Sequence, residues 1–203
     1  DQLLSNLLVY TRPDCSRRGW HETEVLIREV LTLASHAIPP GSIEVRCQVH
    51  PLVPQRWCDG PKMKQVLLNL VLNAVQAMPK GGTLTLTACP ATSEAPESPA
   101  VRITVSDTGT GIPAELQSRV FDPFFTTKDQ GTGLGLAIVH ALIEAHHGRI
   151  DVESSPGHGT SFLITLPRGP MQTASSSVPL VTVSDRPESA REITGVTEEK
   201  RYE

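Results

Sequence analysis

The sequence lacks the features that mark most secreted, membrane-spanning and nucleic-acid-binding proteins. Its four cysteines show no C-x-x-C spacing, so neither a zinc site nor a redox pair is indicated, and reduced thiols are expected. No stretch has the roughly 20 consecutive apolar residues that a membrane crossing requires, and no signal peptide is visible. Acidic residues number 22 against 18 lysines and arginines, and the net charge of -4 offers no broad attraction for nucleic acid or an anionic membrane. We therefore expect a cytoplasmic domain with no nucleic acid partner and no direct membrane contact.

The composition along the chain indicates one folded domain with a different segment at each end. With 203 residues, 38% of them hydrophobic, the chain has material for one core of ordinary size. It begins at Asp1 without a methionine, which indicates a piece of a longer protein. After Pro167 the composition turns to Ser, Thr, Pro and charged residues. We expect a helix end and linker over residues 1–21, one domain over residues 22–167, and a disordered tail or linker over residues 168–203.

Hydrophobic periodicity predicts both helices and strands in the central segment. Val25, Leu26 and Val30 follow a period near 3.6, as on an amphipathic helix, whereas residues 43–49 alternate as in a half-buried strand. The predicted helices span residues 22–36, 61–78, 113–119 and 134–147, and the predicted strands span residues 43–49, 83–88, 101–106, 149–153 and 160–166. This mixed order favours an α+β two-layer sandwich, with a mixed, mostly antiparallel sheet of about five strands covered on one face by about three helices.

A row of amide side chains interrupts the most apolar helix. Gln65, Asn69 and Asn73 stand four residues apart, which places them on one stripe of the helix surface. A buried amide without a partner costs about 1–3 kcal/mol, so these side chains need acceptors, donors or a ligand. A magnesium ion that keeps several waters is one such partner. The alternative is that the amides cap a neighbouring loop or face solvent.

A second group of polar residues follows the strand that ends near Ser106. Asp107 can accept a hydrogen bond from an exocyclic amine, and the turn after it contains Gly109 and Gly111. Glycine permits positive φ and close backbone approach, so a flat ligand could pass near this turn.

The same turn also matches a dinucleotide-binding fingerprint. Gly109, Gly111 and Ala114 have the spacing G-x-G-x-x-A, and Asp129 lies about 20 residues beyond, where that fingerprint has an acid. The fingerprint requires a second parallel strand before the acid, whereas residues 121–128 contain a proline and no strand alternation. We therefore regard this match as superficial.

A third group combines a glycine run with the beginning of a helix. Residues 131–135 read Gly-Thr-Gly-Leu-Gly, and the apolar helix that follows would direct free backbone N–H groups and its positive dipole end toward an anion. Lys128 just upstream could add a point charge for a terminal phosphate. No G-x-x-x-x-G-K-S/T P-loop occurs, and a plain flexible loop is the alternative interpretation of the glycine run.

Taken in order, these groups resemble the ATP-binding catalytic domain of two-component sensor histidine kinases, within the GHKL (Bergerat-fold) superfamily that includes gyrase, MutL and the ninety-kilodalton heat-shock ATPases. The four sequence boxes of that family resemble residues 65–77, 107–111, 121–128 and 131–135. The motif F-D-P-F-F-T-T-K followed by G-T-G-L-G-L-A-I is similar to the lid of the nitrogen-regulation class. The resemblance covers residues 22–167 and implies the fold, the activity and the cofactors ATP and Mg²⁺.

The resemblance also implies a role for each matching residue. Asn73 would ligate Mg²⁺, Asn69 and Lys128 would be the catalytic residues beside the phosphates, and Asp107 would contact the adenine amine. Phe124 and Phe125 would anchor the lid. Gln76 stands where many relatives have a basic residue, so one phosphate contact differs from the family pattern. The nucleotide-binding set would comprise Asn69, Asn73, Asp107, Gly109, Gly111, Ile112, Phe124, Thr127, Lys128, Gly131, Thr132, Gly133, Leu134 and Gly135.

The histidine that such kinases phosphorylate is not evident in this sequence. His21 precedes an acid but lies at the domain boundary, and His146 with His147 at a helix end is more simply a favourable contact with the helix dipole. Residues 3–12 resemble the end of the dimerisation and phosphoacceptor hairpin, so the acceptor would lie upstream of Asp1. The expected partners are therefore that hairpin and, through the whole kinase, a response regulator receiver domain.

Two functions from different classes remain open at this level. In the first, the domain binds Mg-ATP and donates its γ-phosphoryl group to a histidine outside this chain. The fragment would then be monomeric and would not phosphorylate itself, whereas the parent kinase would be a homodimer. In the second, the domain is a nucleotide-binding regulatory module without turnover. A hydrolase or serine kinase of the same superfamily is opposed by the F-F-T-T-K motif.

Overall fold

The computed structural model describes residues 17–53, 55–91, 100–128, 131–167 and 169. The helix end predicted over residues 3–12 and the tail predicted from residue 168 onward (Gly169 excepted) lie outside the described residues, as do residues 92–99. The elements below belong to the compact unit Asp1–Met171.

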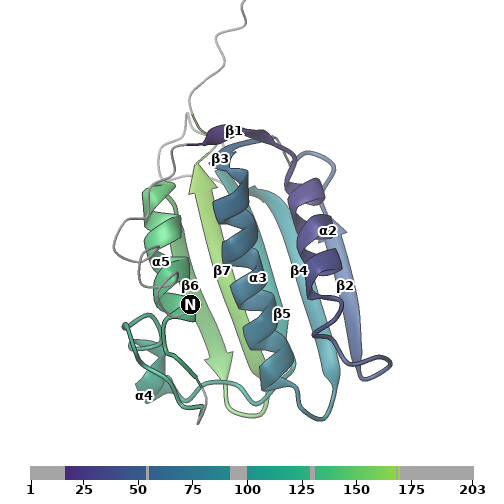
Figure 1. Cartoon of the computed structure of the whole chain (residues 1–203), viewed down its shortest axis with the longest axis vertical. Coiled ribbons are helices and arrows are strands. Elements are labelled where there is room, and N and C mark those ends of the chain that lie inside the picture. The colour runs from purple at the N-terminus through teal and green to yellow at the C-terminus, as the bar shows by residue number, and fades with distance from the viewer. Residues whose placement is uncertain (1–16, 54, 92–99, 129–130, 168, 170–203) are drawn as a thin grey trace, which may run out of the picture. The chain divides into compact units, whose positions relative to one another are not determined.

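A five-stranded sheet forms one layer of this unit (Figure 1). Its strands lie in the order β2-β4-β5-β7-β6, and only the β2–β4 pair is parallel. The strands are β2 (Ile43–Val49), β4 (Gly82–Ala91), β5 (Ala100–Asp107), β6 (Arg149–Ser155) and β7 (Gly159–Pro167). Alternate residues of the central strands, such as Leu84, Leu86 and Ala88, are buried, as the period of two predicts.

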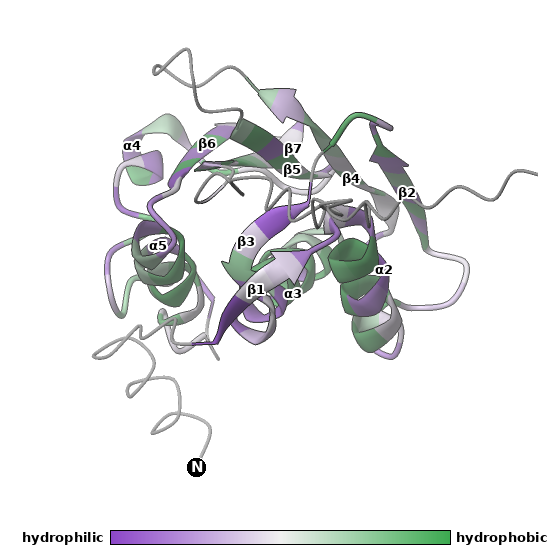
Figure 2. Ribbon diagram, turned by 90° about the horizontal axis from the view of Figure 1, so that it is seen from above, coloured by the Kyte–Doolittle hydropathy of each residue, from purple (hydrophilic) through white to green (hydrophobic). Residues whose placement is uncertain are grey.

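Three helices form the second layer, on one face of the sheet (Figure 2). They are α2 (Thr23–Ala34), α3 (Gly60–Ala77) and α5 (Gly135–Ala145), and the single-turn α4 (Ala114–Gln117) stands apart from them. The predicted α+β two-layer sandwich with a mixed, mostly antiparallel sheet is therefore confirmed. The predicted helix over residues 113–119 is shorter in the structure, where it spans only four residues.

Helix α3 begins and ends where its sequence contains helix signals. The Asp59 carboxylate accepts a hydrogen bond from Lys62 N over 3.1 Å, and Pro61 occupies the first turn, where its missing N–H costs nothing. After Met78, Gly81 has φ 87° and turns the chain toward β4. The helix buries the apolar residues Met63, Val66, Leu67, Leu70, Val71 and Ala74. Its amide-bearing stripe is thereby left outside the core.

A short antiparallel pair, β1 (Arg18–His21) with β3 (Arg56–Asp59), was not predicted. The rings of Trp20 and Trp57 lie across from each other with centroids 5.6 Å apart. Strands of four residues are too short to give a periodic signal. Among the described residues, strand pairing thus includes residues 18–21, which precede the domain start predicted at residue 22.

His146 contacts the last turn of α5, as predicted for a histidine at a helix end, and does so from a buried position. Its side chain is buried, Asp59 N donates to its Nε2 over 3.0 Å, and its Nδ1 lies 2.7 Å from the carbonyl oxygen of Leu142. Because a carbonyl only accepts, Nδ1 carries the proton and the ring is neutral. Burial, the largest cause, lowers the pKa of His146, and the nearby Arg18 adds to the effect.

Within the described residues, none of the helices has the length and apolarity needed to cross a membrane. Among the described cysteines, Cys47 and Cys89 are free thiols.

Candidate functional site

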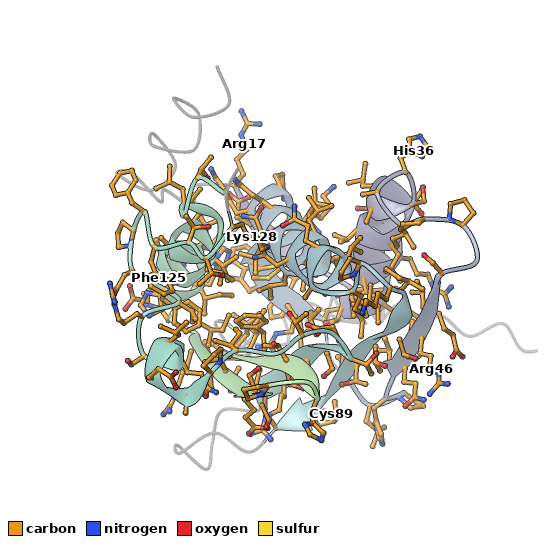
Figure 3. The ribbon with its side chains drawn as sticks, turned by 90° about the horizontal axis from the view of Figure 1, so that it is seen from below. Arg17, His36, Arg46, Cys89, Phe125 and Lys128 are labelled. Atoms are coloured by element: carbon orange, nitrogen blue, oxygen red, sulfur yellow. The ribbon has the colours of Figure 1, made fainter. Side chains whose placement is uncertain are left out.

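A pocket of about 600 Å³ lies between α3, the end of β5 and the glycine-rich chain before α5. Its walls come from four separate stretches of sequence, which is the convergence that the sequence predicts. The predicted residues that line it are Asn69, Asn73, Asp107, Gly111, Ile112, Thr127, Lys128, Gly131, Thr132, Gly133 and Gly135. Gly109, Phe124 and Leu134 do not line it. Lys128 and Phe125 are labelled in Figure 3, on the side of the molecule that carries α5.

The amide stripe of α3 faces this pocket over part of its length. Asn69 donates from Nδ2 to the carbonyl oxygen of Gly135 over 3.3 Å, and Asn73 presents Oδ1 to the ammonium of Lys128. Gln65, one turn earlier, does not line the pocket. The two asparagines therefore have partners in the pocket, while the first amide of the stripe lies outside it.

Asp107 is a buried residue of the pocket lining. Its Oδ1 accepts hydrogen bonds from Gly109 N over 2.8 Å and Thr160 N over 3.3 Å. Burial, the largest cause, raises the pKa of the carboxyl group, whereas the two N–H donors and the charge of Lys128 favour the ionised form. Both bonds use the same oxygen, so Oδ2 is available to orient a ligand.

The two glycines after Asp107 are required by packing. A Cβ on Gly109 would overlap the carbonyl oxygen of Ala77 at the end of α3. Gly111 has φ +70°, and a Cβ there would overlap the backbone of Ser155. Thr110 N also donates to Ala77 O over 3.1 Å. Gly109 therefore acts by letting the turn lie against α3, rather than by lining the pocket as predicted.

The chain between α4 and α5 contains the aromatic residues that were expected to anchor it. Phe124 does not serve as an anchor: its side chain is 65% exposed, and its backbone has φ 65° with N–H donating to Gly133 O over 2.9 Å. Phe125 lines the pocket, and the guanidinium of Arg119 lies 4.7 Å from its ring centroid.

Phe121, which the sequence analysis did not single out, provides the second anchor. Its ring centroid is 6.3 Å from that of Phe162 on β7 and 5.4 Å from that of His140 on α5. The sequence signal was present in the aromatic beginning of this segment. The pattern alone could not tell which ring points inward.

The beginning of α5 combines buried and open positions. Leu134 is buried in the core, so its side chain does not line the pocket as predicted. Leu134 is the N-cap residue and makes no side-chain capping bond, which leaves the N–H groups of the first turn for another acceptor. A Cβ on Gly135 would meet nothing within 4 Å, and its φ is not positive. Neither packing nor backbone conformation explains this glycine.

Lys128 is the only lysine or arginine among the pocket-lining residues of the described chain. Its Nζ lies 2.6 Å from Gln76 Oε1 and 3.2 Å from Asn73 Oδ1. Partial burial lowers the pKa of Lys128, and the charge of Asp107 opposes that change. Across the described residues, no cluster of three or more His, Cys, Asp or Glu side chains could hold a metal ion by itself.

Residues 58–170 match the family described as histidine kinase-, DNA gyrase B-, and HSP90-like ATPase. This chain belongs to that ATPase family. The resemblance to the catalytic domains of sensor histidine kinases is therefore confirmed, whereas the nitrogen-regulation class stays a prediction. Within the family the chain is similar to sensor histidine kinase ZraS of Escherichia coli strain K12. The two are 38% identical over 168 residues, which cover 82% of this chain and 35% of ZraS.

Solved structures of histidine kinases are also similar to this chain. The nucleotide-free catalytic domain of histidine kinase ThkA is 34% identical, with a TM-score of 0.65 over 75% of this chain and 96% of that one. Full-length ShkA in complex with AMPPNP is 32% identical, with a TM-score of 0.71 over 82% of this chain and 35% of ShkA. ThkA in complex with the response regulator protein TrrA is 29% identical, with a TM-score of 0.66 over 82% of this chain and 46% of that one.

The chain spans 35% of the length of ZraS. The match therefore concerns one part of ZraS, and what the whole of ZraS does is a separate question from what this domain binds.

Proposed function

We propose that this domain binds Mg-ATP in the pocket and donates the γ-phosphoryl group to a histidine on a dimerisation hairpin outside this chain. The observation that carries the proposal is one pocket whose lining combines a buried carboxylate with amides, a lysine and a helix N-terminus. Such an arrangement matches a molecule with a flat amine-bearing base and an anionic tail. The family and the AMPPNP-bound relative support it.

The part of the lining around Asp107 suits an adenine ring. Asp107 Oδ2 can accept a hydrogen bond from the exocyclic amine, since Oδ1 is taken by Gly109 and Thr160. The pocket lining also supplies apolar surface for a flat ring, from Ile112, Leu116, Val120 and Phe162. The pocket volume of about 600 Å³ lies within the range of small-molecule sites.

The part of the lining that contains Lys128 and the beginning of α5 suits the phosphates. The first-turn N–H groups of α5 and the positive end of its dipole favour an anion, and Lys128 adds a full charge. Asn69 already bonds the carbonyl of Gly135, so it holds α3 and the beginning of α5 together beside the phosphates. Asn69 and Lys128 would thus position the group to be transferred.

The residues present also fit a magnesium ion. Asn73 Oδ1 lies 3.2 Å from the Lys128 ammonium, so it presents its lone pairs to a cation inside the pocket. Mg²⁺ commonly keeps several waters and takes one or two protein oxygens together with substrate phosphates, so a single amide oxygen is a sufficient protein ligand. When bound, the ion would supply charge neutralisation for phosphoryl transfer.

The proposed phosphoryl acceptor lies outside this domain. None of the residues that line the pocket in the described chain is a histidine. The partners would be the acceptor hairpin of the same kinase and, through the homodimeric parent, a response regulator, as in the ThkA complex with TrrA. We propose a cytoplasmic location for the domain, which by itself would be monomeric.

Phosphoryl transfer tests this proposal directly. The domain is mixed with γ-³²P-ATP, Mg²⁺ and a protein that carries the acceptor hairpin, and acid-labile, base-stable label on the hairpin is the expected product. Asn73→Ala should abolish both ATP binding and transfer, whereas Gln65→Ala, on the same helix but outside the pocket, should retain both. ATP binding without transfer in the natural full-length chain would leave a regulatory nucleotide-binding module instead.

A further inference from the structure

The ammonium of Lys128 rests on two amide oxygens of α3. Its Nζ lies 2.6 Å from Gln76 Oε1 and 3.2 Å from Asn73 Oδ1. The two acceptors are three residues apart on the helix, so they project from the same face. Gln76 makes the shorter bond and is exposed. Both acceptors are neutral, so in these contacts the lysine is held by dipoles and not by a carboxylate.

One of these oxygens has two competing uses. The proposed function assigns Asn73 Oδ1 to Mg²⁺, which binds oxygen at about 2.0–2.1 Å. A lysine ammonium at 3.2 Å from the same oxygen would then lie close to a divalent cation, and the two charges repel. Lys128 must therefore leave Asn73 before the metal can be coordinated. How firmly Gln76 holds the lysine decides how easily this happens.

We propose that Gln76 is a positioning residue, which holds Lys128 against Asn73 in the nucleotide-free domain and releases it to the phosphates when Mg-nucleotide enters. This inference rests on the proposed function. A neutral amide suits the task, because a carboxylate at this position would retain the lysine and repel the phosphates. A basic residue would instead drive Lys128 away from α3. Gln76 thereby sets the Mg²⁺ concentration that nucleotide binding requires.

The expected effect of removing the amide follows from the strength of one hydrogen bond. An exposed bond of this kind contributes about a fivefold preference at most. Gln76→Met keeps the length of the side chain but cannot accept a strong hydrogen bond. At a fixed concentration of ATP, the Mg²⁺ concentration for half-maximal binding should therefore fall by about threefold to fivefold in this variant.

A double-mutant cycle distinguishes an effect of Gln76 through Lys128 from a direct effect of Gln76 on Mg-nucleotide binding. In the Lys128→Met background there is no lysine to hold, so adding Gln76→Met should leave the Mg²⁺ requirement unchanged. Gln65→Met makes the same chemical change on the same helix outside the pocket and should behave as wild type. The proposal is overturned if Gln76→Met raises the Mg²⁺ requirement, leaves it unchanged, or shifts it equally in both backgrounds.

A measurement without nucleotide keeps the result independent of ATP binding. Competitive acetylation of the native domain, read by mass spectrometry, should modify Lys128 faster in Gln76→Met than in wild type or Gln65→Met. If Lys128 were acetylated faster in Gln76→Met but the domain did not bind Mg-ATP, the contact between Gln76 and Lys128 would stand and the proposed function would be rejected. An unchanged rate would show that Gln76 does not hold the lysine, whatever the nucleotide data show.

Discussion

Asn69, in the middle of α3, donates a hydrogen bond from its side-chain nitrogen to the carbonyl oxygen of Gly135, the first residue of α5. The bond spans 66 residues of sequence and 3.3 Å of space. It fixes the beginning of α5 relative to the helix that carries Asn73. Packing does not require a glycine at position 135. A substitution there can therefore test ligand binding without disturbing the fold.

Gly135→Ala should preserve the fold and weaken nucleotide binding. A methyl group there meets no protein atom within 4 Å, and alanine favours helix over glycine, so the free energy of unfolding should stay the same or rise by up to about 1 kcal/mol. A phosphate close to the backbone would meet the new Cβ, and affinity for Mg-ATP should fall by about tenfold, or about 1.4 kcal/mol. Urea denaturation and calorimetric titration measure the two effects. Undiminished affinity would mean that no phosphate approaches this backbone.

Gly109→Ala should show the opposite pattern. Its Cβ would overlap the carbonyl oxygen of Ala77, so the turn must move, and the expected loss of stability is about 2–4 kcal/mol. Gly157→Ala is the comparison, because Gly157 has a positive φ, +78°, but open space around it, whereas Gly109 has no positive φ and close neighbours. The control should lose only about 1–2 kcal/mol, the cost of left-handed backbone. Equal losses in the two variants would show that contact with α3 is not what requires Gly109.

Asp107→Asn should change base selectivity as well as affinity. The N–H groups of Gly109 and Thr160 need an acceptor, so the amide oxygen will turn toward them and its NH₂ group will face the pocket. That donor opposes the adenine amine and matches the carbonyl of guanine. ATP affinity should fall by about tenfold or more, since a buried donor is left unpaired, and the ratio of ATP to GTP affinity should narrow.

Competitive displacement of a fluorescent ATP analogue measures both the ATP affinity and the ratio of ATP to GTP affinity. Asp122→Asn, at an exposed position outside the pocket, is the control and should bind as wild type does. If Asp107→Asn bound ATP and GTP with the wild-type preference, the carboxylate would not be reading the base.

His146 should make stability depend on pH. Its folded pKa lies below the ordinary value of 6.5, mainly because the ring is buried, so the unfolded chain binds the proton more strongly. The contribution of the neutral ring is fully present above about pH 6.5 and is lost as pH falls toward the lower folded pKa. Wild type should therefore lose more stability between pH 7.5 and 5.5 than His146→Gln, measured by urea denaturation.

The neighbouring histidine provides the comparison. His147 is exposed, and its charge is a small part of what lowers the pKa of His146, so His147→Gln should reduce the dependence on pH much less than His146→Gln does. Identical pH profiles for wild type and His146→Gln would show that the buried ring does not titrate on unfolding.

The sequence predicted the sandwich and most of the pocket because both depend on local patterns. Apolar residues at a period of 3.6 place Asn69 and Asn73 on the free side of α3, and glycines mark the two turns. The parts that were missed depend on contacts distant in sequence. Lys128 meets Gln76 across 52 residues, and His146 meets Asp59 across 87. No local pattern encodes which partner a side chain will find.

The backbone conformation of Phe124 explains why this residue does not anchor the lid as predicted. Phe124 and Phe125 are indistinguishable in a motif, but a positive φ at Phe124 turns its side chain outward and leaves Phe125 in the pocket wall. The short β1–β3 pair was invisible for a related reason, since four residues on each side give no periodicity.

A ¹⁵N–¹H correlation spectrum of the domain, titrated with Mg-ATP, tests the central claim most directly, because it reports both binding and its place. The account predicts saturable shifts at one equivalent, largest for the amides of Gly111, Gly131, Gly133 and Gly135 and for the side-chain amide of Asn73. A spectrum of folded protein that stays unchanged up to millimolar Mg-ATP, or shifts confined to residues outside the pocket, would contradict it.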